Sequence, residues 1–160
     1  MNTSNVSTKT FLTIKLLVIT DAAQLYQLID QSRMQLTNLV WSQSATLEST
    51  ITFLENKLAS SDKVHGIFQN KKLVGVLELR KKEDMFELGY WVGTKYRGRG
   101  IMKTAVKQLV DHQVKYHAII AHIRQSNEAS LKVLTNAGLK YDHTEMWQGE
   151  PWIHLKIDKD

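Results

Sequence analysis

The residues YWVGTKYRGRGIM, numbered 90–102, hold the strongest structural signal in this chain. An apolar, aromatic run that is typical of a strand ends at Val92, and a glycine-rich basic segment follows over residues 93–100. Apolar residues then recur at helical spacing from Ile101. The pattern predicts a strand, a tight loop and the start of a helix.

Such a loop is a natural binding site for an anion. The first amides of a helix have no internal partners and lie at the positive end of the helix dipole, so they can bind phosphate. Glycine at 98 and 100 lets the backbone approach an anion closely, and Arg97 and Arg99 add positive charge. The alternative is a simple glycine turn with two solvated arginines. The signatures of P-loop kinases and of dinucleotide-binding Rossmann domains are both absent.

The periodicity on either side of this loop predicts the remaining elements. We expect strands at 11–18, 64–69, 73–80, 85–92, 118–123, 139–147 and 152–157, and helices at 21–36, 47–58, 101–110 and 127–137. Turns are expected at 70–72, 81–84 and 148–151. Only the strands that flank the helix from Ile101 are joined as a parallel pair would be. The order predicts an α+β fold, with a mixed, mostly antiparallel sheet of six to seven strands and about four flanking helices.

Composition narrows the class of protein. We predict one domain over residues 1–160, with residues 1–10 as a polar start that can be flexible. The chain has no cysteine, which excludes disulfides and a cysteine nucleophile. No signal peptide and no run of ~18 apolar residues is present, so we expect a cytoplasmic protein without membrane contact. The net charge of +5 suits an anionic ligand, but the basic residues are too scattered to predict nucleic-acid binding.

Two segments together resemble a known superfamily. Residues 97–100, RGRG, resemble the pyrophosphate loop of the Gcn5-related N-acetyltransferase (GNAT) superfamily. The wider string over residues 87–102 is similar to the branch that acetylates ribosomal proteins on N-terminal serine or alanine. Asn127 and Ser130, followed by NAGL at 136–139, resemble the second cofactor segment of the superfamily. The resemblance covers nearly the whole chain and implies the GNAT fold, with acetyl-CoA as co-substrate.

The resemblance also implies how the cofactor would be bound. The strand before the loop and the next strand would splay apart and admit the pantetheine arm, while a backbone amide meets the thioester oxygen. The amine would attack directly, without an acyl-enzyme, which agrees with the missing cysteine. The implied cofactor-binding residues are Tyr90, Trp91, Val92, Arg97, Gly98, Arg99, Gly100, Ile101, Met102, Asn127 and Ser130.

Proton transfer needs a base for the amine and an acid for the leaving sulfur. The resemblance implies Glu87 or Glu145 as base, although either carboxylate could instead be a surface strand residue. Many superfamily members use a tyrosine as acid where this chain has Leu134, so Ser130, one helical turn earlier, is the remaining candidate. Ser130 could instead bond its own backbone, and Asn127 could cap the helix that follows it.

The acceptor remains open at this level. An α-amine, with a pKa around 8, needs less help to lose its proton than a lysine at about 10.4, which favours a protein N-terminal amine. A small amine, such as a polyamine, aminoglycoside or amino-acid derivative, is the alternative, and a non-catalytic acyl-CoA-binding module is a third. Trp147 and Trp152 are the expected acceptor contacts. We expect no metal, because three histidines are five residues apart and share no face of one element, and the other three lie on separate expected strands: His112, His117 and His122, and His65, His143 and His154. A homodimer is compatible with the sequence.

Overall fold

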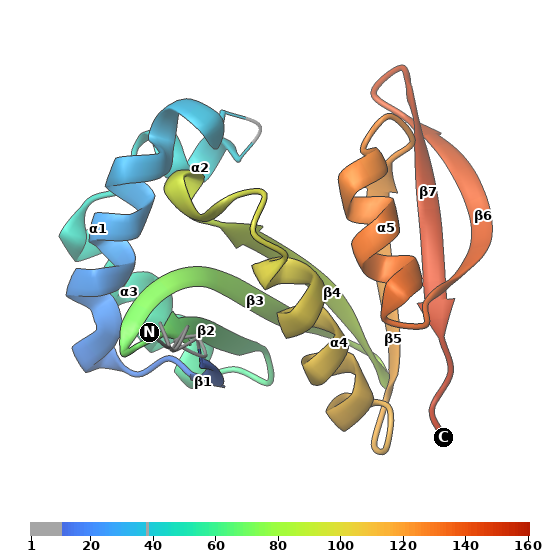
Figure 1. Ribbon diagram of the computed structural model, residues 1–160, viewed down its shortest axis with the longest axis horizontal. Coiled ribbons are helices and arrows are strands. Elements are labelled where there is room, and N and C mark those ends of the chain that lie inside the picture. The colour runs from blue at the N-terminus through green and yellow to red at the C-terminus, as the bar shows by residue number, and fades with distance from the viewer. Residues whose placement is uncertain (1–10, 38) are drawn as a thin grey trace, which may run out of the picture.

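The computed structural model describes residues 11–37 and 39–160, and these form one seven-stranded sheet with helices on both sides (Figure 1). The expected flexible start at residues 1–10 lies outside the described residues. The strands are β1 (Leu12–Leu16), β2 (Lys63–Gln69), β3 (Lys72–Lys82), β4 (Met85–Val92), β5 (Ala118–Arg124), β6 (Lys140–Trp147) and β7 (Glu150–Ile157). The helices are α1 (Ala22–Ser32), α2 (Val40–Gln43), α3 (Leu47–Leu58), α4 (Ile101–Gln113) and α5 (Glu128–Asn136).

The predicted fold class is confirmed. The strand order is β1-β2-β3-β4-β5-β7-β6, and every neighbouring pair is antiparallel except β4 and β5. That parallel pair is the one joined through the glycine-rich loop and α4, as the sequence predicts. None of the helices in the described part of the chain is long and apolar enough to span a bilayer.

The parallel pair is short, and this positions the site. β4 and β5 pair only from Met85 and Ala118 to Glu87 and Ile120. Beyond these residues β4 stays paired with β3 and β5 stays paired with β7, so the two strands diverge (Figure 1). The facing backbone edges of residues 88–92 and 121–124 therefore have no strand partner across the gap.

The helices cover opposite faces at this gap. Lys57 of α3 forms an ion pair with Glu78 of β3, so α3 lies on the face that carries Glu78. Tyr90 of β4 hydrogen-bonds Ser130 of α5 and is paired with Leu77, the neighbour of Glu78, so α5 lies on the other face. We call these the α3 face and the α5 face.

Several predicted boundaries are wrong for local reasons. The helix expected to reach residue 36 ends at Ser32, and a 3-10 turn follows over Arg33–Gln35, because Ser32 leaves helical geometry at φ −111° and ψ 1°. The short helix α2 was not predicted. The first strand covers only Leu12–Leu16 of the expected residues 11–18.

All three hairpin turns are shorter than expected, and the one expected at 81–84 is reduced to residues 83 and 84 between β3 and β4. Gln148 and Gly149, at φ 50° and 78°, close the last hairpin alone, so Glu150 and Pro151 belong to β7. Asn70 and Lys71, at φ 50° and 68°, do the same between β2 and β3. Two successive residues at positive φ match the twist of the flanking strands.

Candidate functional site

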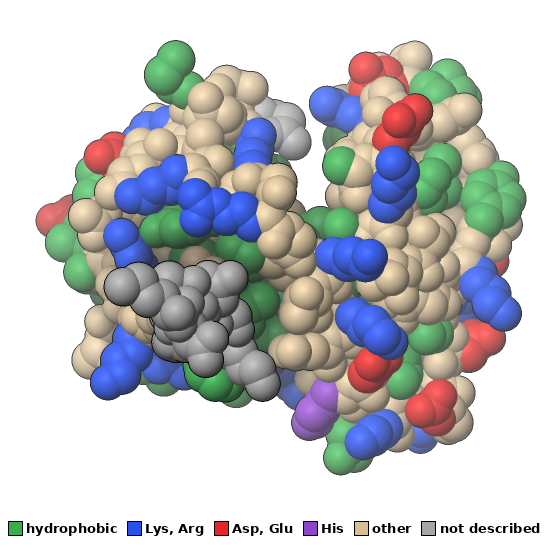
Figure 2. Space-filling view, in the orientation of Figure 1, with side chains coloured by type: hydrophobic (Ala, Val, Ile, Leu, Met, Phe, Trp, Pro, Cys, Tyr) green, Lys and Arg blue, Asp and Glu red, His purple; other side chains and the backbone are tan. Residues whose placement is uncertain are grey.

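A cavity of about 1000 Å³ occupies the gap between β4 and β5. Residues 88–91 of β4 and 121–124 of β5 line it consecutively. Successive residues of a strand point to opposite faces, so the cavity reaches both faces of the sheet. Figure 2 shows a groove at the open end of the diverging strands. On the α5 face it is lined by Asn127, Ser130 and Leu134, and on the α3 face by residues that include Trp41, Phe53 and Lys57.

The glycine-rich loop has the open backbone that an anion needs. Gly98 and Gly100 adopt φ of +73° and +72°, and a Cβ at either position would meet no atom within 4 Å. Gly100 is the N-cap of α4, and no side chain caps that helix. The first amides of α4 are thus free to bind an oxyanion. The predicted strand–loop–helix geometry is confirmed.

Hydrogen bonds to β3, to the end of α1 and to the 3-10 turn after it hold the start of the loop in place. The amide of Gly93 donates to the carbonyl of Val74 at 2.8 Å, and the amide of Thr94 donates to Ser32 Oγ at 3.2 Å. Thr94 Oγ1 bonds Gln35 Oε1 at 3.0 Å. Arg97 Nη2 adds a long contact to the carbonyl of Gln35 at 3.4 Å, so the Arg97 side chain also helps to hold the loop.

The predicted cofactor residues differ in what they expose. The side chains of residues 97–100 are exposed, whereas Ile101 is buried, so only the amide of Ile101 can face a ligand. Met102 packs partly against the core. Among the predicted residues, Tyr90, Trp91, Asn127 and Ser130 line the cavity, whereas Val92 and residues 97–102 lie outside its lining.

Tyr90 and Ser130 join across the α5 face. The Tyr90 hydroxyl lies 2.8 Å from Ser130 Oγ. Burial raises the pKa of Tyr90 to about 12, so its hydroxyl keeps its proton at neutral pH. Asn127 Oδ1 accepts from the amide of Ser130 at 3.1 Å, which confirms that Asn127 caps α5. The sequence singled out Tyr90 only for its backbone and missed this hydroxyl contact.

Glu87 lies at the closed end of the gap, on the α3 face. Its carboxylate is 3.4 Å from Arg80 Nη2, 3.7 Å from Lys82 Nζ and 3.5 Å from His122 Nδ1, and its side chain is 15% exposed. Glu87 is not part of the cavity lining, whereas Arg80 and His122 are. Sequence reasoning missed His122, although its alternation with Ala121 and Ile123 places it on the polar face of its strand.

Three histidines form a row across the outer strands of the α3 face. The ring centroids of His122 and His154 are 4.0 Å apart, and those of His154 and His143 are 4.2 Å apart. The three histidines lie on separate strands, as predicted, and strand pairing places them side by side, which the sequence did not indicate.

Glu145 lies at the outer end of this row. It is on edge strand β6, its side chain is 63% exposed, and it bonds His143 Nε2 at 3.1 Å. Glu145 is separated from the cavity by β7 and is not part of its lining. The ligand atoms of His143, Glu145 and His154 lie within 4.8 Å of one another. Both ring nitrogens of His143 already contact carboxylates, since Asp142 takes Nδ1, so we assign no metal to this group.

The acceptor side of the cavity has aromatic walls. Trp41 and Trp91 line it with ring centroids 6.4 Å apart, and Trp152 lines it while Trp147 packs edge-on against Trp152 at 5.4 Å. Of the two predicted tryptophans, Trp152 reaches the cavity and Trp147 supports it. Trp152 Nε1 is buried and has no hydrogen-bond partner among the residues described.

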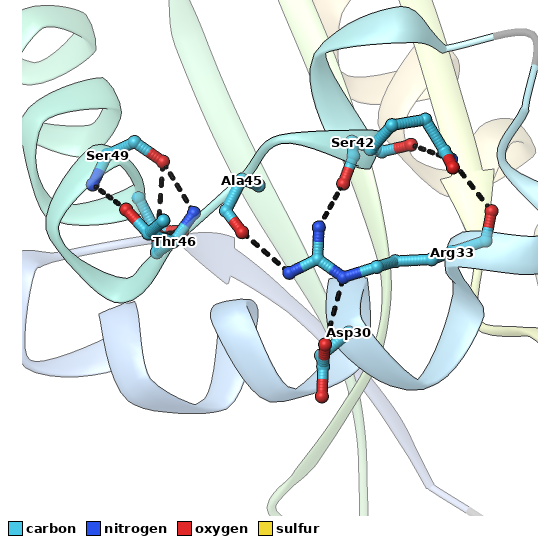
Figure 3. A network of polar contacts seen from close by, with 8 residues as sticks. Asp30, Arg33, Ser42, Ala45, Thr46 and Ser49 are labelled. Atoms are coloured by element: carbon cyan, nitrogen blue, oxygen red, sulfur yellow. Dashed lines mark hydrogen bonds and ion pairs between the residues drawn. The ribbon is translucent and has the colours of Figure 1, made fainter.

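The segment that carries Trp41 is tied to α1 by one arginine (Figure 3). Arg33 donates through Nη1 to the carbonyl of Ser42 and through Nη2 to the carbonyl of Ala45, while its Nε contacts Asp30 at 2.9 Å. Thr46 then caps α3 through the amide of Ser49. This network fixes the path of residues 42–46 beside the cavity.

Comparison with known proteins identifies the family. Residues 12–140 match the family profile described as an acetyltransferase (GNAT) domain. A probable N-acetyltransferase of Bacillus subtilis (strain 168), YjcK, is 33% identical over 98 residues, which cover 55% of this chain and 54% of that protein. The chain thus matches about half the length of this curated relative.

Solved structures share the fold over almost the whole chain. RimL, a ribosomal L7/L12 alpha-N-protein acetyltransferase in complex with coenzyme A, superposes with a TM-score of 0.82 at 21% identity, covering 93% of this chain and 96% of RimL. The microcin C7 self-immunity acetyltransferase MccE, in complex with acetyl-CoA and AMP, gives 0.77 at 17% identity, with 92% of each chain covered. A spermidine N-acetyltransferase SpeG chimera from Vibrio cholerae and hSSAT gives 0.75 at 14% identity, with 92% and 95% covered. At these identities the likeness shows the fold, and the profile match shows that the chain belongs to the GNAT acetyltransferase family.

Proposed function

We propose that this chain transfers the acetyl group of acetyl-CoA to a primary amine, and that the acceptor is the N-terminal amine of a protein or peptide. The observation that carries the proposal is the cavity that crosses the sheet between β4 and β5. A thioester that enters from the α5 face meets an amine that enters from the α3 face within this cavity. Family membership and similar structures with coenzyme A or acetyl-CoA bound support the choice of co-substrate.

The coenzyme would be held at two places. We assign its diphosphate to the free amides at the start of α4, with Gly98 and Gly100 giving close approach and Arg97 and Arg99 giving charge. We assign its pantetheine arm to the unpaired edge of β4 at Tyr90, Trp91 and Val92. Hydrogen bonds to that edge would replace the strand pairing that the sheet lacks there.

Tyr90 and Ser130 would supply the proton for the leaving sulfur. Ser130 Oγ lines the cavity and lies 2.8 Å from the Tyr90 hydroxyl. Because its pKa is raised to about 12, Tyr90 enters the reaction protonated and can resupply Ser130 after transfer. This pair lies on the α5 face, where Leu134 also lines the cavity. The resemblance implies that many superfamily members have a tyrosine at the position of Leu134.

The charge of the cavity favours an N-terminal amine over a polyamine. Lys57, Arg80 and Arg124 line it, whereas Glu78 is the one carboxylate of the lining within the described chain. Glu78 is itself neutralised by Lys57, whose Nζ lies 2.6 Å from its Oε1. The described lining therefore offers no unpaired carboxylate to bind the several amines of a polycation, while a peptide brings a single amine.

The aromatic walls suit a peptide acceptor. Trp152 adds a third indole ring to the lining of the cavity, and its Nε1 is turned away into the protein. Trp41 and Trp91 supply flat apolar surface for the first side chains of the acceptor.

The test is to follow release of free thiol from acetyl-CoA with a panel of acceptors. Peptides with a free N-terminus are expected to be acetylated, and the same peptides with a blocked N-terminus and a free lysine are the matched control. Faster turnover of spermidine or an aminoglycoside would show that the acceptor is a small amine instead of a protein N-terminus. Tight binding of coenzyme A in calorimetry, without turnover of any amine, would show that the chain is a binding module and not an enzyme.

A further inference from the structure

His122 is the histidine that the cavity exposes to the reacting groups. It lies on β5 at the diverging edge, and its neighbours Ala121 and Ile123 point to the α5 face. Its own ring therefore points to the α3 face, where the acceptor enters, and 34% of its side chain is exposed. An imidazole placed there can touch an amine that approaches the thioester.

Glu87 faces this ring from the neighbouring strand. His122 Nδ1 lies 3.5 Å from Glu87 Oε1, a distance at which the carboxylate attracts the ring without a normal hydrogen bond. No ion pair of Nε2 is found within residues 11–37 and 39–160, so Nε2 is the nitrogen left to accept a proton. The other side of the ring packs against His154 at 4.0 Å between centroids.

We propose that His122 is the general base that takes the proton from the attacking amine, and that Glu87 positions its ring instead of acting as the base. This inference rests on the proposed acetyl transfer. It replaces both carboxylates that the sequence suggested.

The other candidate bases are each disfavoured by their surroundings. Glu87 is held by Arg80 and Lys82 and is not part of the cavity lining. Glu78 lines the cavity, but Lys57 occupies its carboxylate. Glu145 lies on the far side of β7. A base must reach the proton that it abstracts, and His122 is the candidate that both lines the cavity and keeps a free nitrogen.

Burial is the main reason why His122 is neutral at pH 7. Burial lowers the pKa of His122 below its ordinary value of 6.5, and His154 on β7 and Arg80 on β3 lower it further. Glu87 on β4 and Glu145 on β6 oppose this by raising it. The neutral imidazole is the form that accepts a proton.

The proton balance of the step is simple. The neutral amine attacks the thioester carbon, and as the C–N bond forms the nitrogen loses a proton to His122 Nε2. When the C–S bond breaks, the sulfur keeps the bonding electron pair and takes a proton from the Ser130–Tyr90 pair. Products are the amide and the free thiol, and the imidazolium and the hydroxyl pair reset through solvent.

The experiment compares His122→Gln with wild type, using saturating peptide and acetyl-CoA. We expect kcat to fall by about 10²- to 10⁴-fold, while the Kd for acetyl-CoA stays within twofold. Added imidazole should restore part of the rate in the variant and leave wild type unchanged. His143→Gln is the matched control, since it alters an outer member of the same row, and its kcat should stay within twofold.

The pH profile of kcat separates His122 from Glu87. Protonation of the acceptor α-amine and protonation of His122 should each lower the rate of wild type in acid, and His122→Gln should lose the second of these two ionisations. Glu87→Gln should keep the His122 ionisation but move it to lower pH, because Glu87 raises the pKa of His122. An acid limb that still contains both ionisations in His122→Gln, or a kcat within threefold of wild type, overturns the proposal. If wild type neither binds acetyl-CoA nor releases thiol, the proposed function fails instead.

Discussion

Replacing Gly100 by alanine tests the assigned diphosphate site, and the chain offers a matched control. Gly100 sits at φ +72° and Gly149, in the β6–β7 turn, sits at φ +78°. A Cβ at either position meets no atom within 4 Å, so neither substitution creates a clash. The two variants introduce the same backbone strain at different places, because Gly100 is the N-cap of α4 and Gly149 lies in the turn between β6 and β7.

The magnitudes follow from this geometry. A non-glycine residue at positive φ costs about 1–2 kcal/mol, so both variants should lose that much stability. For a chain of this size this lowers Tm by about 2–8 °C in each. At Gly100 alone the new methyl group stands in the open space before the α4 amides. If the methyl group prevents two hydrogen bonds from backbone amides to the diphosphate, each worth about 1.5 kcal/mol, the affinity for acetyl-CoA falls about 100-fold.

Calorimetric titration with acetyl-CoA and thermal unfolding of both variants give the answer. Gly149→Ala is expected to lose Tm but to keep the wild-type Kd. Equal Kd values for Gly100→Ala, Gly149→Ala and wild type would show that the diphosphate binds elsewhere, and the assignment of residues 97–102 would then be wrong.

Three further outcomes are expected. Ser130→Ala should lower kcat about tenfold or more with little change in the Kd for acetyl-CoA. Because the two hydroxyls act as one donor, Tyr90→Phe should lower kcat much less in the Ser130→Ala background than in wild type. Additive losses of the two substitutions in steady-state kinetics would contradict this. Arg33→Lys should lower the free energy of unfolding in denaturant by about 1–3 kcal/mol and raise the KM for the acceptor, because an ammonium cannot hydrogen-bond both carbonyls in Figure 3. An unchanged KM would show that this network does not shape the acceptor side of the cavity. Burial lowers the pKa of His65 to about 4. As the pH falls from 6.5 to 4, the unfolded state binds a proton that the folded state does not, so the free energy of unfolding should fall by roughly 3 kcal/mol. His65→Leu should flatten this pH dependence in urea unfolding, and an unchanged slope would refute the argument.

The fold could be predicted because its signals are local. The glycine-rich loop, the periodic helices and the single parallel connection each depend on neighbours within a few residues. Errors occurred where tertiary contacts override local preference. Ser32 leaves the helix and uses its hydroxyl to bond Thr94, sixty-two positions later, and no pattern in the sequence reveals this.

The geometry of the glycine-rich loop was easier to predict than the polar contacts around the cavity. A phosphate site made from backbone amides needs only a strand, two glycines and a helix in order, and these are consecutive residues. A catalytic pair needs residues that meet across strands. Tyr90 and Ser130, and likewise Glu87 and His122, come together only through the register of β4, β5 and α5.

The divergence of β4 and β5 explains why the proposed base and acid do not exchange a proton directly with one another. Tyr90 points to the α5 face and His122 to the α3 face, because each strand alternates its side chains and the two strands share register only up to Glu87 and Ile120. In an intact parallel sheet, paired backbone would fill the space between these groups. With the pairing ended, the reacting carbon can sit between them, so that a proton leaves the amine on one face and another reaches the sulfur on the other. The proposed mechanism therefore requires that β4 and β5 pair over only three residues, and it predicts that a variant with longer pairing would lose activity while gaining stability.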